Sequence, residues 1–212
     1  MTLHDRRVDA CECLAASVFR GILPAVPCGA EPCRGTAPVS STPPADAATV
    51  GYVTTLSDIQ LTTIDGATTG FSHYSDRVLL VVNVASRCGF APQYEKLEAL
   101  QKRFGDRGFT VLGFPSNQFL QELGTDDAIK QYCATTWGVT FPIFQKTKVN
   151  GTSAHPLYQE LVKTKDAAGK AGRVAWNFEK FLLLPNGDVH RFRTRVQPDA
   201  PEIVSLIEAA LP

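Results

Sequence analysis

The sequence predicts an α/β domain in which helices flank a central mixed sheet. Two apolar runs, Val78–Val84 and residues 109–114, lack polar alternation, which is typical of strands buried on both faces. Between them, apolar side chains from Tyr94 to Phe104 recur at a helical spacing. Further along, two strand-like runs flank the turn-forming residues 185–188, Pro-Asn-Gly-Asp, which predicts a hairpin.

The remaining elements follow from local signals. Residues 61–64 before Asp65-Gly66 suggest a short hairpin, and Gly105 is a plausible stop for the first helix. Acidic residues open a helix over Asp126–Trp137. Later expected elements are a short helix around 156–163, strands at 181–184 and 189–192, and a helix from Pro201. Strand, helix, strand, helix, hairpin and helix is the order of a thioredoxin-like domain.

The first fifty residues differ in composition from the rest. They are rich in Ala and Pro and end in a linker-like stretch over 38–48. We expect residues 1–50 to be a disordered extension, or a segment that is not translated because the start codon was assigned too far upstream. The folded domain is expected to span residues 51–212.

Targeting signals in this segment are weak. A modestly apolar stretch over 14–26 follows two arginines, but Glu12 and Arg20 interrupt the region and no small-residue cleavage site follows it. Asp5 and Asp9, together with Glu12, disfavour a mitochondrial presequence. We therefore expect a cytoplasmic protein.

Charge and cysteine content exclude several classes of protein. The chain has 21 basic and 21 acidic residues, so no basic excess predicts nucleic-acid binding. No apolar run is long enough to span a membrane. Four of the six cysteines lie in the first fifty residues, unlike a secreted disulfide scaffold, and their spacing fits no standard zinc site. We expect neither a metal nor a cofactor. The four cysteines in the first fifty residues are Cys11, Cys13, Cys28 and Cys33.

Cys88 is the candidate nucleophile. It lies between the strand Val78–Val84 and a helix, where backbone N–H groups and the helix dipole favour negative charge. Negative charge on sulfur is thiolate, the reactive form of cysteine. The alternative is a buried cysteine that acts as a small hydrophobic residue.

Neutral hydrogen-bond donors follow other strands of the predicted sheet. The Phe114–Phe119 segment and Gln121 lie after the second strand, at the same sheet edge as Cys88. Trp176 and Asn177 precede a later strand. Indole and amide N–H groups can stabilise a thiolate and assist O–O cleavage without adding a charge. Structural alternatives are a core aromatic role for Trp176 and a turn or cap role for Asn177.

Six motifs in order make the chain similar to the glutathione peroxidase family, from about Leu56 to the C-terminus: NVASRCGF, FPSNQF, QELG, FPIF, KVNG and WNFEKF. The resemblance implies a thioredoxin-like fold and reduction of hydroperoxides. It places the family's catalytic tetrad on Cys88, Gln121, Trp176 and Asn177. The loop before Glu122 is one residue shorter than usual and Leu123 replaces a proline, so Gln118 is the alternative tetrad amide.

The resemblance also implies a role for Cys133. It lies where thioredoxin-dependent members keep a resolving cysteine, which condenses with oxidised Cys88, and the alternative is a buried structural cysteine. A thioredoxin-like dithiol protein would then be the reductant, whereas a low-molecular-weight thiol would cap Cys88 directly. Between Gly151 and Trp176 the chain lacks the extra segment that tetrameric members of the family use for assembly, so the resemblance favours a monomer. A redox relay to a regulatory partner is the main alternative function, and an inert binding module is disfavoured.

Overall fold

The computed structural model describes residues 56–212, so the expectations for residues 1–50 and their four cysteines lie outside the described residues. Within this range, six strands and four α-helices follow one another, joined in places by single 3-10 turns. In chain order they are β1 Gln60–Thr62, β2 Thr68–Gly70, β3 Val78–Val84, α2 Gln93–Phe104, β4 Phe109–Pro115, α3 Asp126–Trp137, α4 Pro156–Leu161, β5 Lys180–Leu183, β6 Val189–Phe192 and α5 Pro201–Ala210.

The central sheet is mixed, as the sequence predicted. Its strand order is β4-β3-β5-β6, with β3 and β4 parallel and the other two pairings antiparallel. Strands β1 and β2 form a separate antiparallel hairpin. The carboxyl ends of β3 and β4 therefore lie together, where open α/β sheets place their chemistry.

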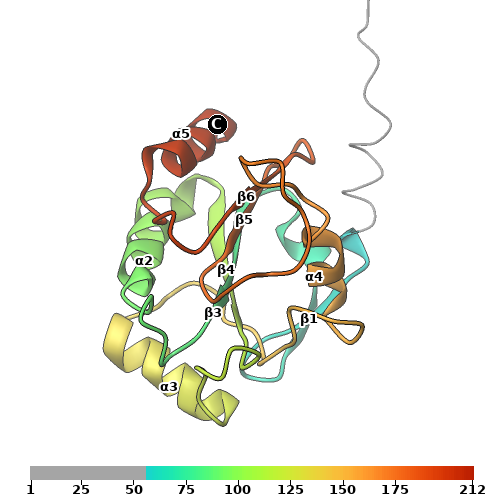
Figure 1. Ribbon diagram of the computed structural model, residues 1–212. Helices are drawn as coiled ribbons and strands as arrows, with labels where there is room; N and C mark the ends of the chain where they lie inside the picture. The colour runs from blue at the N-terminus through green and yellow to red at the C-terminus, as the bar shows by residue number, and fades with distance from the viewer. Residues whose placement is uncertain (1–55) are drawn as a thin grey trace, which may run out of the picture. The chain divides into compact units, whose positions relative to one another are not determined.

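Strand β3 separates two hydrophobic layers because its successive side chains point to opposite faces. Leu80 and Val82 pack with residues of α2 and α5, whereas Leu79 and Val81 pack with residues of α4. Figure 1 shows α2 and α5 on one side of the sheet and α4 with β1 on the other. All seven residues of β3 are buried, which explains why its sequence is apolar at every position but Asn83.

The predicted helices are confirmed, with one difference at the end of α2. The helix ends at Phe104, but Gly105 keeps a right-handed helical conformation (φ −55°) and the chain continues through one 3-10 turn. The left-handed residue is Gly108, at φ +96°. The chain turns into β4 only after this extra 3-10 turn, so the glycine with positive φ comes three residues later than the sequence suggested.

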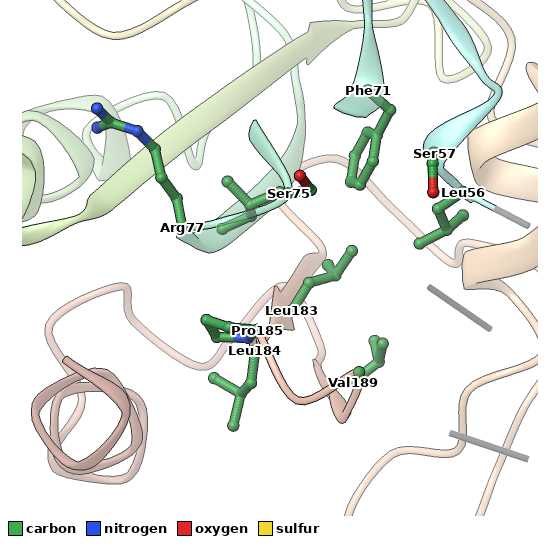
Figure 2. A pocket seen from close by; sticks show the side chains of 11 residues that line it. Leu56, Ser57, Phe71, Ser75, Arg77, Leu183, Leu184, Pro185 and Val189 are labelled. Atoms are coloured by element: carbon green, nitrogen blue, oxygen red, sulfur yellow. The ribbon is translucent and has the colours of Figure 1, made fainter. Parts of the chain in front are cut away.

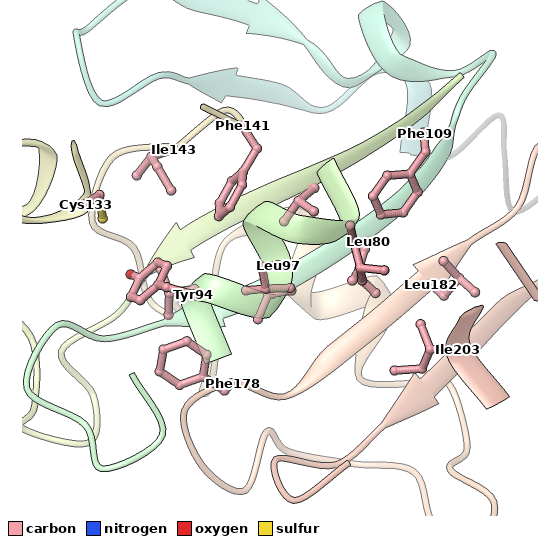
Figure 3. Packing of buried hydrophobic residues seen from close by; sticks show 14 of the residues in the cluster. Leu80, Tyr94, Leu97, Phe109, Cys133, Phe141, Ile143, Phe178, Leu182 and Ile203 are labelled. Carbon is pink, nitrogen blue, oxygen red and sulfur yellow. The ribbon is translucent and has the colours of Figure 1, made fainter. Parts of the chain in front are cut away.

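Helix α3 has clear ends but a thin interface with the body. The Thr125 side chain caps its N-terminus by accepting from the Ala128 N–H at 3.3 Å, and Gly138 (φ +61°) ends it. Of its twelve residues only Ile129 and Cys133 are buried. Figure 3 places Cys133 beside Ile143 and Tyr94 at the edge of the core. The half-buried Tyr132 and Trp137 also pack against this core, so four side chains of α3 hold the helix against it.

None of the helices in residues 56–212 is long and apolar enough to cross a membrane.

The segment 141–144 lies along β4, where the Gly113 N–H donates to the Pro142 carbonyl and the Gly113 carbonyl accepts from the Phe144 N–H, both at 2.9 Å. A Cβ atom at Gly113 would lie 2.5 Å from Ile143 Cδ1. Gly113 therefore permits the close approach of this segment.

We expect Gly113→Ala to lower the free energy of unfolding by about 1–3 kcal/mol, because the added methyl group overpacks the contact with Ile143. Urea titration followed by circular dichroism measures this. Gly124→Ala is the control, since a Cβ there meets no atom within 4 Å. Equal effects of the two substitutions would contradict the steric explanation.

Candidate active site

Cys88 lies in the turn between β3 and α2 and is 5% exposed. Its sulfur accepts a hydrogen bond from the Phe90 N–H at 3.4 Å, and its carbonyl accepts from the Ala91 N–H at 2.9 Å. Helix α2 begins only at Gln93, so the N–H group that reaches the sulfur belongs to the turn and not to the helix itself. The turn nevertheless supplies the kind of donor that stabilises negative charge on sulfur.

Gln121 and Asn177 are brought together beside this turn. Asn177 Nδ2 donates to Gln121 Oε1 at 3.0 Å, and the Gln121 carbonyl accepts from the Arg87 N–H at 2.8 Å. Asn177 is fully buried, and its Oδ1 has no partner. This bond uses the Gln121 side-chain oxygen as its acceptor. The Gln121 NH₂ group takes no part in it and can donate to another atom. Three distant segments therefore meet next to Cys88.

Gln118 occupies a different place. Its Oε1 accepts from the N–H groups of Val149 and Asn150 at 2.7 and 2.8 Å, and its Nε2 donates to the Asn150 carbonyl at 3.0 Å. Both ends of this amide are therefore used to hold the 149–150 turn. Of the two candidate amides, Gln121 is the one bonded to Asn177.

Trp176 lies at the rim of the site and not in the core. Its side chain is 38% exposed, and its ring centroid lies 5.2 Å from that of Phe119 with the planes inclined at 44°. The alternative of a buried core aromatic is therefore wrong. Phe119 belongs to the loop that also carries Gln121, so the two site segments contact each other through rings as well as amides.

Asn83 on β3 is a site residue that the sequence analysis missed. Its Nδ2 donates to the Trp176 carbonyl at 3.0 Å, and its Oδ1 accepts from the Glu179 N–H at 3.0 Å. Its own carbonyl accepts from the Phe178 N–H at 2.6 Å. Phe178 takes φ +61°, a strained conformation for a non-glycine residue. A polar side chain within an otherwise apolar strand was the available signal.

Buried charged residues hold the loop 176–179 in place. Glu179, fully buried, pairs with Arg191 at 2.5 Å and accepts from the Ala175 N–H at 2.9 Å. Lys180, also fully buried, donates to the carbonyls of Phe178 at 2.5 Å and Thr194 at 3.4 Å. Burial lowers the pKa of Lys180 to about 7. These contacts fix the backbone that presents Trp176 and Asn177.

Cys133 lies on α3, is 2% exposed and, like Cys88, is a free thiol. Burial raises the pKa of Cys133 to about 11. A cavity of about 360 Å³ borders it, between α3, the β1–β2 turn and the segment 139–143. Cys88 and Cys133 belong to the same hydrophobic cluster. In this conformation Cys133 is a protonated thiol.

A second cavity lies away from these residues. It has a volume of about 30 Å³ and is lined by Leu56, Phe71 and the β5–β6 turn (Figure 2). It also contacts Leu79, near the amino end of β3, whereas Cys88 follows the carboxyl end of that strand. None of the five predicted site residues lines it.

The fold and the site define a thioredoxin-fold thiol peroxidase. Residues 56–162 match the glutathione peroxidase family model. The chain is 48% identical over 169 residues to the thioredoxin/glutathione peroxidase BtuE of Escherichia coli, covering 70% of this chain and 92% of that protein. It is 48% identical over 155 residues to the hydroperoxy fatty acid reductase gpx1 of Synechocystis, covering 70% and 90%.

A solved structure agrees with these relatives. The crystal structure of Trgpx in its apo form superposes with a TM-score of 0.57 at 37% identity, covering 74% of this chain and 95% of that one. The chain belongs to the glutathione peroxidase family.

We expect the stability of the protein to depend on the titration of Lys180. Its pKa is about 7 when folded and near 10.5 when unfolded, so between these values the unfolded state binds more protons. The cost of burying the ammonium group is therefore full below pH 7 and disappears as the pH rises to about 10.5. The free energy of unfolding of the wild type should rise over this interval relative to that of Lys180→Met.

Urea titrations of both proteins at several pH values across this range measure the difference, in which the contributions of other titrating groups cancel. Two parallel stability curves would contradict the lowered pKa of Lys180.

Proposed function

We propose that this protein reduces hydroperoxides through Cys88 and is recycled by a thioredoxin-like dithiol protein. The observation that carries the proposal is the meeting of Gln121 and Asn177 at the turn that holds Cys88. The names of the relatives support both parts, since one is a thioredoxin/glutathione peroxidase and another a hydroperoxy fatty acid reductase.

In the first step the Cys88 sulfur attacks the terminal peroxide oxygen. The S–O bond forms as the O–O bond breaks, which leaves Cys88 as a sulfenic acid and releases an alcohol or water after proton transfer. Gln121, Asn177 and the Trp176 indole donate neutral hydrogen bonds to the thiolate and the departing oxygen. Neutral donors suit this buried site because they add no charge that would need a partner.

In the second step the Cys133 thiol condenses with the sulfenic acid to form a Cys88–Cys133 disulfide and water. Disulfide geometry requires the two Cα atoms to come within about 7 Å of each other. The thin interface of α3, with only Ile129 and Cys133 buried, favours local unwinding that delivers Cys133. A dithiol protein then restores both thiols by exchange.

Hydrogen peroxide and small organic hydroperoxides are the proposed substrates. Next to the site, Leu120 is 87% exposed and Trp176 38% exposed, so an apolar rim is available to the organic part of a hydroperoxide.

We further propose that residues 51–212 form the peroxidase domain and that the protein is a cytoplasmic monomer. Its free thiols at Cys88 and Cys133 fit a reducing compartment.

Treatment of the reduced protein with one equivalent of hydrogen peroxide should give a Cys88–Cys133 disulfide, because sulfenic acid at Cys88 has a resolving thiol within the same domain. Non-reducing peptide mass spectrometry measures the linkage. In Cys133→Ser, sulfenic acid at Cys88 should accumulate instead. Oxidised Cys88 with Cys133 still free in the wild type would assign resolution to an external thiol, and unreacted Cys88 would refute the peroxidase proposal.

Gln121→Ala should slow the reaction of Cys88 with hydrogen peroxide by roughly a hundredfold, the usual cost of losing one donor to developing charge. Competition against a peroxidase of known rate measures this. Gln118→Ala is the matched control, since Gln118 holds the 149–150 turn and should affect stability more than rate. The reverse pattern would make Gln118 the active-site amide.

A further inference from the structure

Glu122 is a buried carboxyl group whose pKa is raised by burial, and the Ser86 hydroxyl is the side chain that lowers that pKa by hydrogen bonding. The residue is 6% exposed. Its Oε1 accepts from the N–H groups of Ser86 at 3.0 Å and Leu123 at 2.7 Å. A buried carboxylate calls for an explanation, because taking its charge out of water costs stability.

Glu122 is hydrogen-bonded to the segment that leads into the Cys88 turn. Ser86, which donates to it, is two residues from Cys88. Leu123, its chain neighbour, packs against the hydrophobic cluster that contains both Cys88 and Cys133. The negative charge of Glu122 also contributes to the raised pKa of Cys133, after the larger effect of burial.

The resolution step needs a proton acceptor at this location. A thiol attacks a sulfenic acid as its thiolate, and Cys133 is a protonated thiol before α3 unwinds to deliver it to Cys88. The hydroxyl group that leaves Cys88 must at the same time receive a proton to depart as water. One group that accepts the first proton and supplies the second would meet both needs.

We propose that the Glu122 carboxylate is the general base of the resolution step. It takes the proton of the Cys133 thiol as that sulfur attacks the Cys88 sulfenic acid and the S–S bond forms. It returns the proton to the oxygen as the S–O bond breaks, so one water is released and Glu122 is again a carboxylate. This inference rests on the proposed Cys88–Cys133 cycle.

The other titratable groups around Glu122 are less suited to this role. From α2, Tyr94 has a pKa raised well above its usual value by burial, so its hydroxyl stays protonated. Lys146 Nζ donates to the carbonyls of Leu123, at 3.3 Å, and Gly124. Its positive charge lowers the pKa of Glu122, but burial is the larger effect and raises that pKa overall. A raised pKa makes a carboxylate a better base.

The test separates oxidation of Cys88 from resolution. Reduced protein is mixed with one equivalent of hydrogen peroxide and quenched at increasing times. Mass spectrometry then counts the Cys88 sulfenic acid, trapped with dimedone, and the Cys88–Cys133 disulfide. Glu122→Gln keeps an oxygen for the Ser86 and Leu123 N–H groups but cannot accept a proton.

The matched control is Glu98→Gln. Glu98 is also a buried glutamate, 3% exposed, and it accepts from Thr140 N at 2.8 Å and Oγ1 at 2.9 Å, just beyond α3. Its substitution therefore weakens the attachment of the same region without removing Glu122. Disulfide formation should be slower by about a hundredfold in Glu122→Gln and close to the wild-type rate in Glu98→Gln.

The outcomes distinguish this inference from the proposed function. Equal rates of disulfide formation in the wild type and Glu122→Gln would overturn the role of Glu122 and leave the cycle intact. A wild type that forms no Cys88–Cys133 disulfide would overturn the cycle and the inference together. Slow resolution in both glutamine variants would assign the effect to loosening of this region, and would also overturn the inference.

A second measurement compares the pH dependence of resolution in the wild type and in Glu122→Gln. A base must be ionised, so the wild-type resolution rate should fall as the pH is lowered through the raised pKa of Glu122. In Glu122→Gln this fall should be absent. A purely structural role through Oε1 would leave the two pH profiles parallel, which would refute the proposal even if the variant resolves slowly.

Discussion

The buried Asn83 side chain is the constraint on which the site depends. It lies near the carboxyl end of β3, five residues before Cys88, and its amide is satisfied by the Trp176 carbonyl and the Glu179 N–H. The loop 176–179 is thereby fixed to the strand that leads to the nucleophile. Both amide ends are desolvated, so a substitution that leaves the loop groups unpaired costs more than one hydrogen bond. The left-handed Phe178 backbone persists because these contacts hold it.

The parts of the fold that depend on local patterns could be predicted from the sequence. The bounds of β3 and α3 are those expected, because an apolar run without polar alternation and acidic residues in a first helical turn are local signals. The choice between Gln118 and Gln121 could not be made in this way. It depends on which amide reaches Asn177, more than fifty residues away. Asn83 and Glu122 were missed for a related reason, since their roles arise from partners that only the fold brings close.

The loop 176–179 and helix α3 differ in how firmly they are held. The loop 176–179 rests on the buried Glu179–Arg191 pair and on Lys180, so the donors near Cys88 are held in place. Helix α3 is fully buried at only two of its residues, and the indole N–H of its last residue, Trp137, has no hydrogen-bond partner. The proposed Cys88–Cys133 cycle requires this difference, because the donors near Cys88 must stay in place while Cys133 moves.

The positions of the two tryptophans make one of them an optical reporter of α3. Trp176 lies at the rim of the site, whereas Trp137 ends α3 and stacks on Tyr94 with centroids 6.1 Å apart. Release of α3 would move the Trp137 indole from this stack into water and shift its emission to longer wavelength, without requiring Trp176 to move. A change in the intrinsic fluorescence of the unlabelled protein on release of α3 would therefore come from Trp137.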